Sequence, residues 1–368
     1  MRPRGTFGEI HVTGDGFRTL DVYRLFFRDA LRAANQRRAD YERDVVPLLA
    51  SDYDFVEGNF YSASQALAAP DVLSGLSLPR LQTLLGQLVC TQREHDAEGA
   101  AEPHLPHERA LARALGWDLT PALPWAAWSQ AQAGQANPQP QAWITPCHWQ
   151  VGMDQVLMHD PARLQLSDEE SQQLLHAMQP FLKEDGLQVT WHSALTWHAQ
   201  GDMLADLPTA SLDRVIGANV KHWMPESAAA RPLRRLQSEM QMLLYNHPVN
   251  DAREARRQPT VNSFWLHGAG VLPAQTPANA PALLADGLRA AALQGHAQAW
   301  QAAWQELDAT VLAAALTQLQ SHGALRLTLC SEHAAHTYEA QPQAWHQRLL
   351  RPFRKTPAHA ALQALITP

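Results

Sequence analysis

The order helix, glycine, strand in the last quarter of the chain constrains the fold more than any other feature. Apolar residues at steps of three and four predict a helix over 299–320, Gly323 is placed to end it, and 325–330 alternates apolar and polar residues as a strand does. A second strand-like run, 261–268, comes earlier in the chain. Helices alternating with strands are typical of the α/β class, so we expect a mixed or parallel sheet flanked by helices.

Caps and turns mark further elements in the middle of the chain. Ser167, followed three residues later by Glu170, forms a capping box that predicts a helix start. The run 187–200 combines Val, Thr and Trp and predicts two short strands or a hairpin. Apolar residues at steps of three and four predict a helix over 231–246. This helix should end before Pro248, because proline disfavours helical geometry in the residue that precedes it.

The length of 368 residues indicates two domains or one large domain with an insertion. Residues 1–52 read as an amphipathic helical extension. We expect an α/β core over 53–145 and 260–368, with a smaller α+β lobe inserted over 146–259. Between 120 and 140 Pro, Ala and Gln are frequent and no periodicity survives, which predicts a linker or surface loop.

Composition excludes several classes of protein. A net charge of -7 gives no general cationic surface, so we expect no nucleic-acid partner. The 3 cysteines contain no C-x-x-C pair and predict neither a disulfide scaffold nor a cysteine zinc site. The 18 histidines show no H-x-x-x-H or H-E-x-x-H spacing. No apolar run approaches the roughly 20 residues of a spanning helix, so we expect a cytoplasmic protein without a membrane partner.

The densest group of polar residues lies between 243 and 270. His247, Asn250, Arg253 and Asn262 can all donate hydrogen bonds, and the arginines of this segment match phosphate or carboxylate oxygens. One interpretation is therefore a site for an anionic small molecule. The alternative is structural: a helix stop, an Asn250 cap for a short charged helix, and an Asn262 that pins a strand.

This segment carries a resemblance to a known family. The order His-Pro-Val-Asn-x-x-Arg over 247–253, followed by Asn262 and Trp-Leu-His-Gly-Ala-Gly over 265–270, resembles the archaeal-type cofactor-independent phosphoglycerate mutases. Together, the stretches 144–156, 207–220, 234–256 and 261–270 resemble the proteobacterial RpfE-type regulatory family, a distant relative of those mutases. The resemblance implies an alkaline-phosphatase-like fold.

The mutase family uses a serine nucleophile and two metal ions, which clamp the attacking and leaving oxygens of the transferred phosphoryl group. Matching residues 115–118 to the family's Leu-Gly-Tyr-Asp places His107 at the serine and Glu108 at the neighbouring aspartate. The usual nucleophile is therefore absent, and the resemblance makes His107 a nucleophile or base beside Glu108. Glu332 and His333 correspond to the family's Asp-His pair and would be metal ligands.

Three functions remain open. The first is a phosphoglycerate-mutase-like protein without the usual nucleophile and metal site, with no cofactor, which binds a phosphorylated small acid through His247, Asn250, Arg253 and Asn262. The second is an active mutase or phosphatase with an altered site, which would require Mn, Mg or Zn. The third is a regulatory module that binds a protein partner and no small ligand.

Overall fold

The structure is a computed structural model that describes residues 72–73, 75–96, 102–119, 122–153, 155–276, 288–293, 295–340 and 357–366. Contacts divide the chain into two compact units, Met1–Ser62 and Ala63–Pro368, and all described residues belong to the second. The amphipathic extension expected over 1–52 lies outside the described residues.

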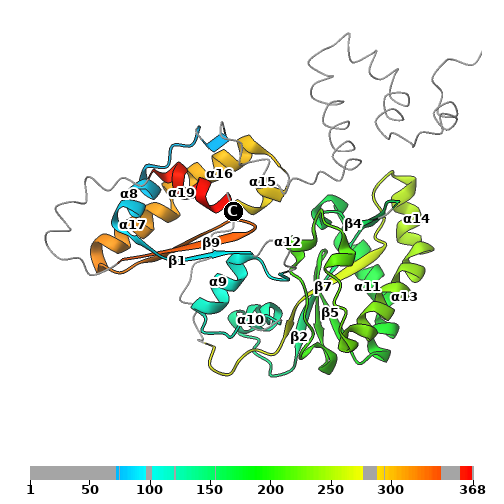
Figure 1. Cartoon of the computed structure of the whole chain (residues 1–368). Coiled ribbons are helices and arrows are strands. Elements are labelled where there is room, and N and C mark those ends of the chain that lie inside the picture. Colours follow the sequence, from blue (N-terminus) through cyan, green and yellow to red (C-terminus); the bar gives the residue numbers. More distant parts are fainter. Residues whose placement is uncertain are drawn as a thin grey trace, which may run out of the picture. The chain divides into compact units, whose positions relative to one another are not determined.

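Strands of the described residues pair into three sheets (Figure 1). The largest has the order β5-β6-β2-β7, and its strands are β2 (Gln141–Cys147), β5 (Gln188–Ser193), β6 (Thr196–Gln200) and β7 (Ser263–Gly270). The second has the order β1-β9-β8, and its strands are β1 (Val89–His95), β8 (Arg326–Cys330) and β9 (Ala334–Glu339). A small hairpin joins β3 (Trp149–Val151) and β4 (Val156–Met158).

All of these strand pairs are antiparallel. The combination of helices and strands agrees with the α/β class, but a mixed or parallel sheet is wrong for the described strands. The reason is local, because β5–β6 and β8–β9 are each joined by only a few residues, and a parallel pair needs a crossover of a dozen or more. The β5–β6 hairpin itself confirms the prediction for 187–200.

One face of the four-stranded sheet packs on α11 (Asp168–Glu184) and α13 (Arg231–Tyr245). Both helices follow from the sequence. The Ser167 Oγ accepts from the Glu170 amide at 3.2 Å while the Glu170 carboxylate accepts from the Ser167 amide at 3.2 Å, which confirms the capping box. The apolar stripe of α13 is buried, and the helix ends before Pro248 as expected.

The other face of this sheet contacts α10 (Trp125–Gln132) and α12 (Leu212–Val215). The helix α10 lies in the range where a loop was expected. Its apolar residues surround the axis, with Ala126 and Ala127 buried and Trp128 packed against the ring of Trp125, so the stretch has no polar face to show a period.

The three-stranded sheet shares a core with helices on one face. These helices are α8 (Pro79–Gln87), α16 (Ala297–Ala309), α17 (Val311–His322) and α19 (Ala358–Ile366). The single helix expected over 299–320 is two helices that meet at Thr310. The φ of -110° and ψ of -77° at Thr310 depart from ideal helix values, and its hydroxyl donates to the Glu306 carbonyl at 2.7 Å, a contact that bends helices. Gly323 does end α17 in the left-handed conformation, with φ 70°.

Shorter elements complete the described chain. The remaining α-helices are α9 (Pro106–Ala114), α14 (Pro248–Ala255) and α15 (Arg289–Leu293), and 3-10 turns cover Pro161–Leu164, Asp202–Leu204, Val220–His222 and Ala228–Ala230. The four-stranded sheet combines β2 and β7 with β5 and β6, although only the latter two lie in the range 146–259 expected for an inserted lobe. None of the helices in the described ranges is long and apolar enough to cross a lipid bilayer.

The close approach of β7 to α10 depends on Gly268, which has a φ of +63°. A Cβ at this position would lie 3.1 Å from the Trp125 Cβ and 3.3 Å from the Ala126 amide nitrogen. We expect Gly268→Ala to lower the free energy of unfolding by about 2–4 kcal/mol, since it adds this contact to the cost of a left-handed residue. Urea denaturation measures the change.

Gly134→Ala is the matched control. Its φ is +76°, but a Cβ there meets nothing within 4 Å, so only the backbone cost of about 1–2 kcal/mol applies. Equal losses in the two variants would show that the contact between β7 and α10 adds nothing.

Candidate functional site

Arg214, in the short helix α12, is the centre of a buried polar cluster. Its Nη2 donates to the Asp96 carboxylate at 2.9 Å and to the His104 carbonyl at 3.1 Å, and its Nη1 donates to the Glu332 carbonyl at 3.0 Å. The guanidinium also lies 5.6 Å from the centre of the Trp223 ring. We call this group the Arg214 cluster, with the members Glu94, Asp96, His107, Glu108, Arg109, Ser211, Asp213, Arg214 and His333.

Buried charges in the cluster compensate one another. Arg109 contacts Asp96 at 2.6 Å and Glu94 at 2.5 Å. Burial alone would raise the pKa of Asp96, but hydrogen bonds and charge from Arg109 and Arg214 hold that pKa below its ordinary value. Glu94 behaves in the same way, because Arg113 and Arg109 outweigh its burial and lower its pKa. Asp96 and Glu94 are therefore ionised at neutral pH and form ion pairs with arginines.

Glu108 has the opposite electrostatics. It lies in the first turn of α9, where its carboxylate accepts from the Leu105 amide at 2.7 Å. Burial raises the pKa of Glu108 to about 7, although the Leu105 amide and the Ser211 hydroxyl act to lower it. Burial also lowers the pKa of the adjacent His107. Near neutral pH, Glu108 can thus exchange a proton while His107 stays neutral.

One donor of the cluster is unsatisfied. The Arg214 Nε is buried and has no hydrogen-bond partner among the described residues, whereas the buried Ser211 hydroxyl lies against the Glu108 carboxyl and lowers its pKa. Ser211 lies beside Glu108, and the charge of Arg214 acts on both Glu108 and His107. A buried donor without an acceptor costs about 1–3 kcal/mol, so an acceptor bound here would be stabilised.

The cluster extends toward the end of β7. Arg289 of α15 donates to the Asp213 carboxylate at 2.6 Å. His267 of β7 lies within reach of both charges, its Nε2 is 3.1 Å from the Thr145 hydroxyl, and burial lowers its pKa to about 4. The charges of Asp213 and Arg289 act on both His267 and His107.

The structure brings two predicted pairs of site residues together. His107 and Glu108 on α9, and Glu332 and His333 between β8 and β9, all lie around Arg214, although the two pairs are far apart in the sequence. Sequence analysis missed Arg214 itself. Nothing in the composition of residues 211–216 shows that the Asp and Arg there face residues from distant segments.

The pair Glu332 and His333 does not form a metal centre with a third ligand. Within the described ranges, no group of three or more His, Cys, Asp or Glu side chains is arranged to hold a metal ion. His333 does approach the Asp96 carboxylate at 3.4 Å, but the same oxygen accepts from Arg214 at 2.9 Å. A metal site at Glu332 and His333 stays a prediction from the family resemblance.

The residues predicted to bind a ligand in the His-Pro-Val-Asn segment all have protein partners, and ligand binding by them stays a prediction. Asn250 is buried and donates to the Leu244 carbonyl at 2.7 Å and to the Val261 carbonyl at 2.8 Å, while its oxygen accepts from the Val261 amide at 2.9 Å. These three bonds hold the start of β7 against the end of α13. Asn250 lies inside α14 and is not its cap, a role that His247 takes by accepting from the Val249 amide at 3.2 Å.

Arg253 is fully buried, and each of its guanidinium nitrogens has an acceptor. The Nε donates to the Pro259 carbonyl at 2.8 Å, the Nη1 to the Glu170 carboxylate at 2.6 Å, and the Nη2 to the Leu164 carbonyl. Asn262 pins β3, since it accepts from the Trp149 amide at 2.7 Å and donates to the Trp149 carbonyl at 2.8 Å. The structural interpretation of this segment therefore describes its contacts.

Comparisons with known proteins place limits on the resemblance. No family model and no curated protein matches the chain. Solved structures similar to it include a cofactor-independent phosphoglycerate mutase from Thermoplasma acidophilum DSM 1728, with 12% identity, coverage of 80% of this chain and 92% of that chain, and a TM-score of 0.33. A second is the PH0037 protein from Pyrococcus horikoshii, with 15% identity, coverage of 62% and 54%, and a TM-score of 0.26. Scores this low carry no conclusion about fold or activity.

The structural role of Asn250 is testable. We expect Asn250→Ala to lower the free energy of unfolding by about 2–4 kcal/mol, because it leaves buried backbone groups of residues 244 and 261 without partners. Urea denaturation gives the value, and Asn246→Ala, at an exposed position, is the control, with an expected change within about 0.5 kcal/mol. If Asn250→Ala is as stable as the native sequence, the structural role is contradicted and Asn250 is again a candidate ligand contact.

The raised pKa of Glu108 predicts a pH dependence of stability. The folded protein keeps this proton up to about pH 7, whereas the unfolded chain loses it near 4.5, so stability from this group falls as pH rises between those values. We compare the free energy of unfolding of Glu108→Gln with that of the native sequence. We expect the difference to shift in favour of the variant by about 2–3 kcal/mol between pH 5 and pH 8. Thermal or urea unfolding at both pH values measures this, and the exposed Glu184→Gln should show no such difference.

Proposed function

We propose that the Arg214 cluster binds a small phosphorylated acid. The observation that supports this is the buried, unsatisfied Arg214 Nε–H, which lies in one cluster with the Ser211 hydroxyl and the first turn of α9. Phosphate oxygens are strong acceptors, and hydrogen bonds to a charged acceptor are about twice as strong as neutral ones. The sequence predicted a phosphorylated small acid as the ligand of Arg253, and the present proposal gives the same ligand to Arg214.

In this proposal, the protonation state of Glu108 controls how strongly the phosphorylated acid binds. The other carboxylates of the cluster are already paired with arginines, whereas Glu108 has no cationic partner among the described residues. An anion that enters the cluster therefore meets the Glu108 carboxyl. Ionised Glu108 would repel the ligand, whereas protonated Glu108 can donate a hydrogen bond to it. Since the pKa of Glu108 is about 7, binding should strengthen as pH falls from 8 to 6.

A second candidate function is catalysis in the same cluster. A carboxyl group with a pKa of about 7 is suited to general acid–base work at neutral pH, and the neutral His107 beside it can accept a proton. The chemistry consistent with these groups is phosphoryl transfer or phosphate-ester hydrolysis with an altered mutase site. Mn, Mg or Zn would belong to this function if one of them is required.

Isothermal titration calorimetry with 2- and 3-phosphoglycerate at pH 6 and pH 8 tests the binding proposal. We expect binding that is tighter at pH 6, and about tenfold weaker binding in Ser211→Ala, because one hydrogen bond to a charged acceptor is lost. Ser129→Ala, at an exposed position of α10, is the matched control and should bind like the native sequence.

Assays of mutase and phosphatase activity with and without Mn, Mg and Zn separate the two candidates. Turnover that disappears in Glu108→Gln supports catalysis, and binding without turnover supports a ligand-binding protein. No binding at millimolar concentration of either phosphoglycerate would contradict the proposal and leave a protein partner, as in the regulatory interpretation, to be sought by pull-down.

A further inference from the structure

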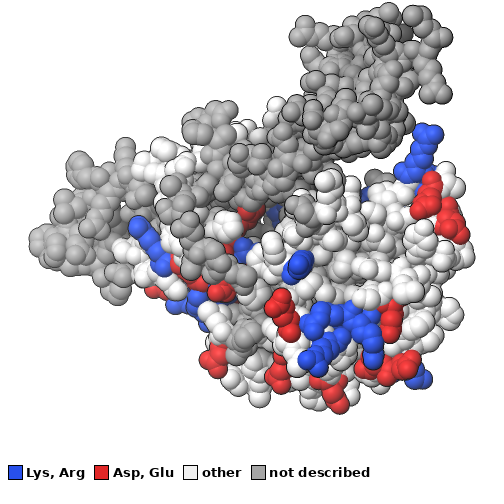
Figure 2. All heavy atoms as spheres, turned by 45° about the vertical axis from the view of Figure 1, so that its right-hand side comes forward, with Lys and Arg blue, Asp and Glu red and all other residues white. Residues whose placement is uncertain are grey.

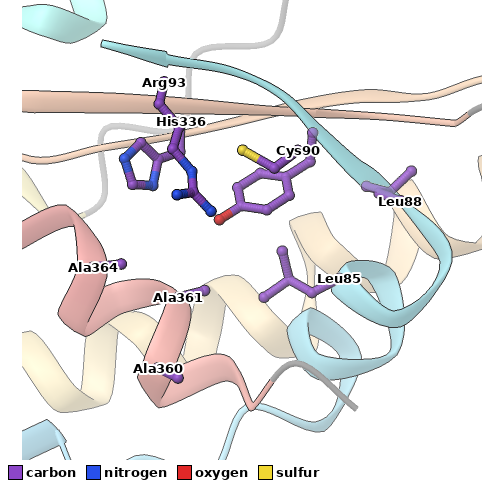
Figure 3. Close-up of a pocket in the computed structure, with 9 residues that line it drawn as sticks. Leu85, Leu88, Cys90, Arg93, His336, Ala360, Ala361 and Ala364 are labelled. Atoms are coloured by element: carbon purple, nitrogen blue, oxygen red, sulfur yellow. The ribbon is translucent and has the colours of Figure 1, made fainter. Parts of the chain in front are cut away.

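A pocket of about 190 Å³ lies between the three-stranded sheet and helices α8 and α19 (Figure 3). Its polar side is formed by Arg93 of β1 with His336 and Tyr338 of β9, and its apolar side includes Leu85, Leu88 and Ala361. The pocket is thus suited to a small molecule with one polar end and one apolar end.

Arg93 differs from the arginines of the Arg214 cluster. Its side chain is exposed, and no carboxylate of the described residues lies within ion-pair distance of it. Its side-chain partner is the uncharged thiol of Cys90, which lines the same pocket. On the face of the molecule shown in Figure 2, by contrast, the largest group of basic side chains is bordered by acidic ones. A guanidinium at the edge of a partly apolar pocket is therefore available to bind an anion.

His336 and Tyr338 supply the other polar atoms. His336 is 2% exposed, its Nε2 lies 3.1 Å from the His95 Nε2, and its buried Nδ1 has no hydrogen-bond partner within the described part of the chain. Burial raises the pKa of Tyr338, so its hydroxyl stays protonated at neutral pH and can donate a hydrogen bond. A buried histidine nitrogen without a partner is costly in an empty pocket.

We propose that this pocket binds a small organic carboxylate with a short apolar tail. The carboxylate contacts the Arg93 guanidinium and the Tyr338 hydroxyl, and the tail contacts Leu85, Leu88 and Ala361. A free phosphate would leave the apolar side unfilled, which is why the carboxylate is preferred. The pocket shares no residue with the Arg214 cluster, because successive residues of β1 point to opposite faces: Glu94 contacts the cluster, and Arg93 lines the pocket.

Titration of the full chain with acetate, butyrate, hexanoate and benzoate tests the proposal, with inorganic phosphate as the competing anion. We expect affinity to rise from acetate to hexanoate or benzoate, because a longer tail buries more apolar surface. Arg93→Gln should weaken the best carboxylate at least tenfold, since it removes a charged hydrogen-bond donor from an exposed position that is not part of the core. Ala361→Leu should also weaken it, by filling the apolar side.

Arg326→Gln is the matched control, because Arg326 lies on β8 in the same sheet but pairs with Glu339 outside the pocket. Ser211→Ala should likewise leave carboxylate binding unchanged, so that a failure of the phosphoglycerate proposal and a failure of this one are seen separately. The proposal is overturned if the longer acids bind no better than acetate, if phosphate alone depends on Arg93, or if Arg93→Gln binds like the native sequence.

Discussion

The carboxylate of Asp96 is the interaction on which the arrangement of the site depends. It accepts from Arg109 of α9 and Arg214 of α12 and lies next to His333, so a single buried side chain joins the end of β1 to three other segments. Removing one member of such a group is far more costly than the net gain of forming it, because the charges left behind stay buried without partners. This mutual dependence fixes α9 relative to α12 and so places Glu108 beside Ser211.

Local signals in the sequence were enough to find most of the elements. The capping box at Ser167, the β5–β6 hairpin and the end of α17 at Gly323 each depend on a few adjacent residues, and each is confirmed. Sheet direction was not predictable in this way. A helix followed by a strand occurs in parallel and in antiparallel sheets. The direction of pairing depends on which strand lies beside β8, and that strand is β9, a few residues further along the chain.

The site was harder to predict than the fold, for a physical reason. An arginine in a sequence shows that a charge is present but not whether a carboxylate neutralises it. Arg253 was an attractive ligand contact until the structure placed Glu170 and two carbonyl groups around it. Arg93 drew no attention in the sequence, yet it lines a pocket and, like several other described arginines, has no carboxylate within ion-pair distance in the described structure.

This distinction changes the meaning of the segment that resembles the mutases. Asn250, Arg253 and Asn262 hold the loop before β7 through backbone carbonyl and amide groups, which any ligand would have to displace at a cost of several hydrogen bonds. Residues with such contacts are needed for this part of the chain to fold, whatever the protein binds. A function has to be argued from groups that the fold leaves without a partner, and among these the Arg214 Nε and the His336 Nδ1 lie at the two proposed sites.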